Sequence, residues 1–212
     1  MIISHAFKPD IVRCVPARID PGQLEKDLAY LQGKALSKGA CDCAVIKKTD
    51  IVFNPDILRR VASDNRLPSV HWPLDYPRDD LNEAIEAYEW AVFFQIAIDP
   101  SMPDPGGGPI EQTAHRQKFI KTYEIVTVIE SSAFYMGYHL AIGLASGNCR
   151  AVFCPEQKRC PATLKGRTCI RPNMGRPAME AAGIDARAMA AALNWETPAE
   201  PAPFLGGLVM IH

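Results

Sequence analysis

The chain has 212 residues, of which 48% are hydrophobic and 22% charged, with a formal net charge of −1. This length and composition are typical of a globular protein that buries a hydrophobic core. The near-zero charge argues against binding to nucleic acid or to an anionic membrane by bulk electrostatics. No apolar run approaches the roughly 20 residues that cross a bilayer, and the start lacks a secretory signal pattern, so we expect a cytoplasmic protein.

The first half of the chain predicts a mixture of strands and helices. Asp20 and Pro21 stand in the favoured order for a helix start, and Gly39 for its end. The nearly continuous apolar run at residues 90–98 predicts a strand covered on both faces. The remaining predictions are a strand at 10–19, two short strands around a turn within 43–53, a helix at 55–62, a loop at 64–79 and a helical stripe at 81–88.

The second half predicts one long helix and a closing strand. The apolar periodicity from Glu111 to about Ser146 favours a helix, with a bend near Gly137 or Gly143. Glu130 lies on its apolar stripe, so we expect a structural ion pair with an arginine, with a functional proton donor as the alternative. After the cysteine-rich stretch we predict a short helix begun by Pro177, a helix capped by Asp185, and a last strand at 206–211.

These elements predict an α+β protein in which a small mixed sheet is packed by long helices and carries a cysteine-rich metal-binding loop. We divide the chain into an α+β part (1–98), a Pro/Gly-rich linker (99–110) and a helical part (111–212) with the metal site and the closing strand. We expect the two parts to form one compact unit.

Four of the seven cysteines lie within 21 residues, in the spacing C-x4-C-x5-C-x8-C: Cys149, Cys154, Cys160 and Cys169. Clustered thiols in a reducing compartment usually bind a metal, because disulfides do not persist there. From Cys149 to Arg176 the chain carries seven basic residues and one glutamate. Such a basic setting favours thiolates and offsets the charge of a thiolate-bound metal.

The spacing leaves several metal states open. Structural zinc sites usually have ligands in close pairs, and no C-x-x-C pair occurs here. Prolines directly follow Cys154 and Cys160, as in the Cys-Pro ending of ferredoxin motifs, so we predict an iron–sulfur cluster, [4Fe–4S] in type. Zinc, or thiols without metal, are the alternatives. Arg150, Arg171 and Arg176 are the predicted cofactor-binding residues, because they lie close to the cysteines and can bind an anionic group.

The same stretch resembles a known family. The features are Gly147-x-Cys149-Arg150, the three later cysteines, the string RPAME from Arg176, and the string AGID from Ala182. They resemble the cysteine-rich predicted metal-binding proteins catalogued as domain of unknown function 2284, closely over residues 120–212. The resemblance implies metal binding but no known reaction. The family typically also has an N-terminal cysteine group, whereas the corresponding residues 60–77 contain no cysteine.

Two functions are compatible with these patterns. One is a redox protein whose cluster exchanges electrons with a partner protein or serves a reductive step. The other is an interaction or regulatory module that zinc holds in shape. The sequence has no recognisable nucleophile–base pair, nucleotide loop or dinucleotide motif, so it names no catalysed reaction.

Overall fold

The structure is a computed structural model that describes residues 19–63, 84–99, 113–158, 160–163, 168–195 and 203–212. Within these residues, four strands form one sheet in the order β1-β2-β4-β3. The strands are β1 (Asp42–Lys47), β2 (Trp90–Ala97), β3 (Ile142–Ala145) and β4 (Phe204–Met210). The α+β prediction is confirmed. The predicted mixed sheet is replaced by one in which all three strand pairs are antiparallel.

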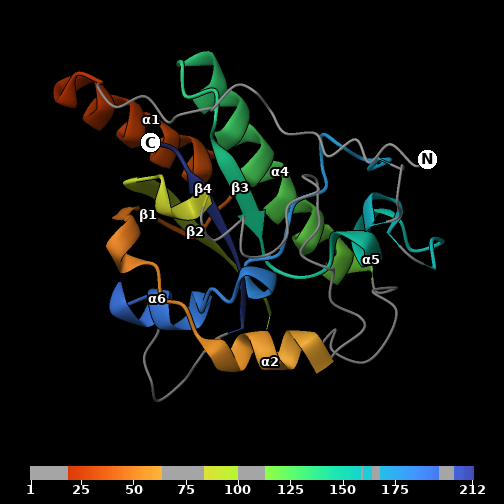
Figure 1. The fold of residues 1–212 in the computed structure, drawn as a ribbon. Coiled ribbons are helices and arrows are strands. Elements are labelled where there is room, and N and C mark those ends of the chain that lie inside the picture. The colour runs from red at the N-terminus through yellow and green to blue at the C-terminus, as the bar shows by residue number, and fades with distance from the viewer. Residues whose placement is uncertain (1–18, 64–83, 100–112, 159, 164–167, 196–202) are drawn as a thin grey trace, which may run out of the picture.

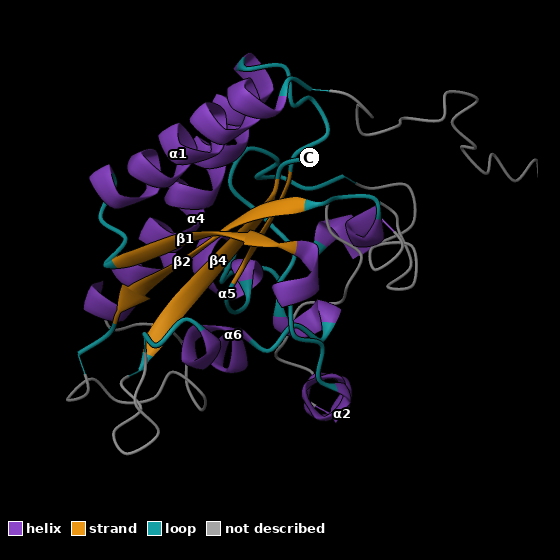
Figure 2. Cartoon of the chain, turned by 90° about the vertical axis from the view of Figure 1, so that its left-hand side faces the viewer, coloured by secondary structure: helices purple, strands orange, loops and turns teal. Residues whose placement is uncertain are grey.

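Helices cover both faces of this sheet (Figures 1 and 2). The helices include α1 (Pro21–Ser37), α2 (Pro55–Ser63), α4 (Thr113–Tyr135), α5 (Cys149–Phe153) and α6 (Ala186–Ala192), of which α5 contacts α4. Short 3-10 helices span Lys48–Asp50, Pro161–Thr163 and Glu180–Ala182. The predicted caps are confirmed: the Asp20 side chain accepts from the N–H of Gly22, and Asp185 accepts from the N–H of Ala188.

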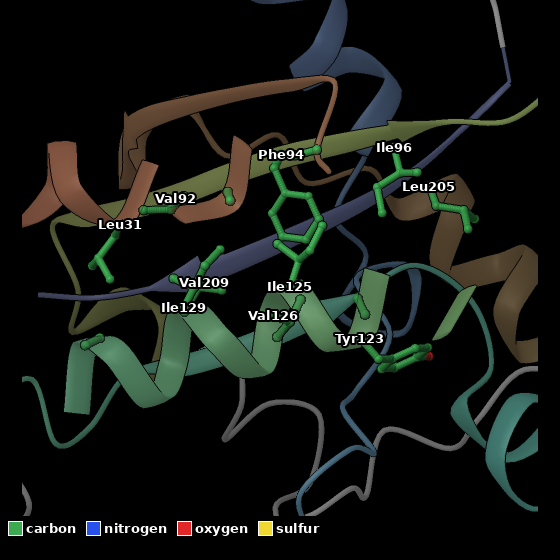
Figure 3. Close-up of a cluster of buried hydrophobic side chains, with 14 of the residues drawn as sticks. Leu31, Val92, Phe94, Ile96, Tyr123, Ile125, Val126, Ile129, Leu205 and Val209 are labelled. Carbon is green, nitrogen blue, oxygen red and sulfur yellow. The ribbon is translucent and has the colours of Figure 1, made fainter. Parts of the chain in front are cut away.

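The core lies on the two faces of β2 and β4. On one face, side chains of β2 and β4 pack against α1 and α4, as Figure 3 shows for Phe94, Leu31 and Ile129. On the other face, Phe93 and Leu208 pack with Met179 and Met189. Both faces of β2 are therefore buried, as its continuous apolar run predicts.

The predicted helix from Glu111 to Ser146 is wrong in its last third. α4 ends at Tyr135, Gly137 adopts a φ of +101°, and Ile142–Ala145 is a strand paired with β4. A short apolar run suits a buried helix and a buried strand equally well, so pairing with a distant strand decides between them. Gly143 allows close packing here, because a Cβ would lie 2.3 Å from Cγ1 of Val126.

Two smaller predictions also change. Residues 43–53 contain one strand, β1, followed by a 3-10 helix, and Phe53 forms only an isolated bridge with Ile184. The helix predicted from Pro177 is a 3-10 helix, which Gly183 ends with a φ of +79°. The predictions for residues 10–18, 64–79 and most of the linker lie outside the described residues. Among the described helices, none combines the length and apolarity needed to cross a membrane.

Candidate metal site

A tight turn after β3 leads into the cysteine stretch. Gly147 has a φ of +80°, and a Cβ there would lie 2.6 Å from Cε1 of Phe119. Asn148 then caps α5, since its side-chain oxygen accepts from the N–H of Arg150 at 2.9 Å. At position 147, only glycine adopts the positive φ beside the Phe119 ring without strain. The turn therefore delivers Cys149 to the first position of α5.

Cys149 is buried, with 6% of its surface exposed, and packs beside the core that α4 covers. Burial raises the pKa of its thiol to about 12, and repulsion from the thiolate forms of Cys160, Cys169 and Cys154 adds to the increase. A hydrogen bond from the backbone N–H of Arg176 acts in the opposite direction. Cys154, Cys160 and Cys169 therefore lie close enough to Cys149 for their charges to affect its pKa.

Cys154 follows the end of α5 and is also buried. Burial raises the pKa of its thiol, as do the charges of Glu156, Cys169 and Cys160, whereas Arg171 lowers it. Cys160 and Cys169 are half-buried. The backbone N–H of Arg171 donates to Sγ of Cys169 over 3.3 Å. Backbone N–H groups therefore point at two of the four sulfurs.

The other described cysteines lie elsewhere. Cys41 directly precedes β1 and Cys43 lies within it, and Sγ of Cys41 donates to the carbonyl of Gln95. Burial raises the pKa of Cys43 to about 12, and no other thiol contributes to that increase. Cys14 lies outside the described residues. The six described cysteines form no disulfide.

The side chains of the four clustered cysteines do not form a closed coordination shell in this structure. Within the described part of the chain, no group of three or more histidine, cysteine, aspartate or glutamate side chains is arranged to hold a metal ion. The donor chemistry nevertheless suits a soft or borderline metal, since four cysteines belong to one short segment, Arg171 acts on Cys154 through its charge, and a backbone N–H donates to Cys169.

The three predicted arginines make different contacts. Nη1 of Arg150 donates to the carbonyl of Gln157 at 2.6 Å, which holds the turn between Cys154 and Cys160. Arg171 is exposed and acts on Cys154 through its charge. The guanidinium of Arg176 donates to Glu130 and to the carbonyls of Pro172 and Gly175.

Glu130 makes the ion pair expected from the sequence. Its Oε2 lies 2.5 Å from Nε of Arg176, and its Oε1 accepts from the N–H of Gly143 at 2.7 Å. Burial raises the pKa of Glu130, while Arg176 lowers it by its charge and its hydrogen bond. One carboxylate therefore connects α4, β3 and the segment that follows Cys169.

A second polar group supports the turn before Cys149. Glu180 accepts from the N–H of Gly147 at 3.3 Å and bonds to the Ser146 side chain, and burial raises its pKa. The hydroxyl of Tyr123 donates to the carbonyl of Gly147 at 3.1 Å. Sequence reasoning missed Tyr123, because its place on the apolar stripe of α4 indicates only a core residue.

A comparison with known families matches residues 69–209 to the family described as "Predicted metal-binding protein (DUF2284)". The chain belongs to this family. It is therefore a predicted metal-binding protein, and the match includes all four clustered cysteines as well as β2, α4 and β3. No curated protein and no solved structure matches the chain.

Proposed function

We propose that Cys149, Cys154, Cys160 and Cys169 hold one iron–sulfur cluster, [4Fe–4S] in type, which serves electron transfer or an accessory redox step. The observation that carries the proposal is that four cysteines belong to a segment of 21 residues in which Cys149 and Cys154 are buried and a backbone N–H donates to the sulfur of Cys169. Cysteine thiolates are the usual ligands of such clusters. A cluster held there would supply one-electron redox chemistry.

The surroundings of the sulfurs favour a cluster over a single zinc ion. Backbone N–H groups of Arg171 and Arg176 point at Cys169 and Cys149, and hydrogen bonds to sulfur are a main means of tuning cluster potentials. The cysteines are also at least five positions apart in the chain, wider than the close pairs of structural zinc sites.

The chain's own residues would bind and orient the sulfurs. The Gly147 turn, supported by Glu180 and Tyr123, presents Cys149. Arg150 holds the turn that separates Cys154 from Cys160. The ion pair of Arg176 with Glu130 anchors the segment behind Cys169 to α4.

The test is the metal and acid-labile sulfide content of the full chain, purified without air. We expect iron and sulfide in near-equal amounts, together with the broad visible absorption of a cluster. Changing any one of the four cysteines to serine should reduce the iron content. The matched control, Cys41→Ser directly before β1, should leave it unchanged.

Other results would overturn this assignment. Stoichiometric zinc without sulfide would replace the cluster with a zinc-stabilised interaction or regulatory module. Folded protein with neither metal would refute a metal site in this stretch. If the cluster is found, a redox partner should dock near the basic residues around it, and its electron exchange with the reduced protein should slow at high ionic strength.

A further inference from the structure

A groove lies between the middle of α1 and the end of α4, away from the cysteines. It has a volume of about 400 Å³ and is lined by Asp27, Tyr30, Ser132, Tyr135 and Met136. The groove residues at the end of α4 lie 9 to 13 positions beyond Tyr123. This separation corresponds to about 14–20 Å at 1.5 Å per residue. The groove is thus a separate feature from the candidate metal site at the other end of α4 (Figure 1).

Regular helix spacing brings these side chains together. Asp27 and Tyr30 are three residues apart on α1, and Ser132, Tyr135 and Met136 have the spacing of one turn at the end of α4. Residues at such spacing share one face of a helix. The two packed helices therefore contribute one wall each.

Asp27 supplies negative charge to the groove. Only 8% of its surface is exposed, although it lines the cavity. Its carboxylate accepts from Nε2 of Gln23 and from the hydroxyl of Tyr138, both at 2.8 Å and both neutral donors. Within the described residues, no lysine, arginine or histidine pairs with it. A buried carboxylate with only neutral partners is complementary to a cation.

The tyrosines add a second feature that favours a cation. Tyr30 is 50% exposed and Tyr135 is 87% exposed, so both rings are accessible to a ligand. The ammonium group of Lys34 lies over the Tyr30 ring, 5.2 Å from the ring centroid. Faces of aromatic rings attract ammonium groups, and the contact with Lys34 is an example within this chain.

We propose that this groove binds a small organic ammonium ion, with Asp27 as the counter-charge and Tyr30 and Tyr135 as the aromatic walls. The volume is at the lower end of small-molecule sites. A bare metal ion suits the groove less well, because one carboxylate and one hydroxyl supply few of the oxygen ligands that hard cations require. The thioether of Met136 completes the apolar wall.

The experiment is a titration of the full chain with butylammonium chloride, followed by NMR of the Met136 ε-methyl group. Butanol is the uncharged probe of equal length, and sodium chloride controls for ionic strength. We expect a saturable shift of the Met136 signal with butylammonium only. Asp27→Asn should weaken binding by about tenfold or more, as expected for loss of a charged partner.

Tyr135 provides a variant that leaves folding unaffected, since its ring is almost entirely exposed. Tyr135→Ala should weaken binding roughly two- to fivefold, the range of an exposed cation–π contact, whereas Tyr135→Phe keeps the ring and the affinity. Glu124→Gln is the matched carboxylate control on the exposed side of α4.

Three outcomes would overturn the proposal. They are equal binding of butanol, a shift that does not saturate, and affinity that Tyr135→Ala leaves unchanged. If Asp27→Asn fails to fold, the affinities of the Tyr135 variants for butylammonium test the proposal. A capped lysine peptide that bound more tightly than butylammonium would assign the groove to a partner's lysine and refute a small-molecule ligand.

Discussion

Arg176 and Glu130 are 46 residues apart in the chain and form an ion pair in which only 12% and 17% of the two side chains are exposed. The same Glu130 carboxylate accepts the N–H of Gly143 in β3. The backbone N–H of Arg176 meanwhile interacts with Cys149. The pair therefore connects the candidate metal site to the helix and strand that form the core behind it.

Replacing Arg176 with methionine should destabilise the fold. The variant leaves Glu130 as a largely buried carboxylate without its cation, and we expect the free energy of unfolding at neutral pH to fall by about 2 kcal/mol. Urea denaturation measures the change. Lys121→Met removes the exposed pair with Glu124 and should cost at most about 0.5 kcal/mol. Equal effects of the two variants would show that burial of the pair does not matter.

The cost of Arg176→Met should depend on pH. Burial already raises the pKa of Glu130, and loss of Arg176 removes the group that lowers it. A carboxyl whose pKa is raised by folding contributes stability that is complete below its ordinary pKa and is lost as the pH rises through the folded-state pKa. The difference in the free energy of unfolding between Arg176→Met and wild type should therefore be smallest near pH 4.5 and increase toward neutral pH. A constant difference across this range would contradict the assignment.

A second substitution should restore part of the stability. In the double variant Arg176→Met and Glu130→Gln, the buried group at position 130 is neutral and its amide oxygen can still accept from Gly143. We expect a recovery of about 1 kcal/mol relative to Arg176→Met alone, at neutral pH. A double-mutant cycle by urea denaturation measures the coupling. Strictly additive losses would mean that the two side chains act independently.

Gly147→Ala should affect both stability and metal content. The residue has a φ of +80° and a Cβ would lie 2.6 Å from the Phe119 ring, so we expect a loss of about 1–3 kcal/mol. The shifted turn should also reduce iron or zinc bound by the purified protein. Gly33→Ala on α1 meets no heavy atom within 4 Å and should be neutral or stabilising by about 0.5–1 kcal/mol. Full metal content in Gly147→Ala would show that metal binding does not depend on the conformation of this turn.

Removal of the bound metal by a chelator should loosen the cysteine stretch and leave the sheet folded. β2 is buried on both faces and pairs with β1 and β4, and this packing does not depend on the clustered thiols. Amide hydrogen exchange should increase over residues 147–180, with little change in β2 and β4. Global loss of protection after chelation would instead make the metal essential for the whole fold.

The sequence by itself determined the elements that depend on local chemistry. The Asp20 and Asp185 caps, the buried run of β2 and the closing strand β4 all follow from nearby residues. The cysteine cluster was visible from spacing alone, and the family match from residues 69–209 supports metal binding. These features were predictable because caps, apolar periodicity and short ligand spacings act over a few residues.

Only the tertiary structure decided the rest. Ile142–Ala145 became a strand because β4, more than 60 positions later, offers it a partner (Ser146 Oγ also accepts from the N–H of Gly206). Arg176 was one of several basic residues that could have paired with Glu130, and only the fold brings it to the carboxylate that also accepts from Gly143. The groove at Asp27 exists only where α1 meets α4. Such contacts join residues far apart in the chain, so their partners are chosen by the packing of the whole core and not by local sequence.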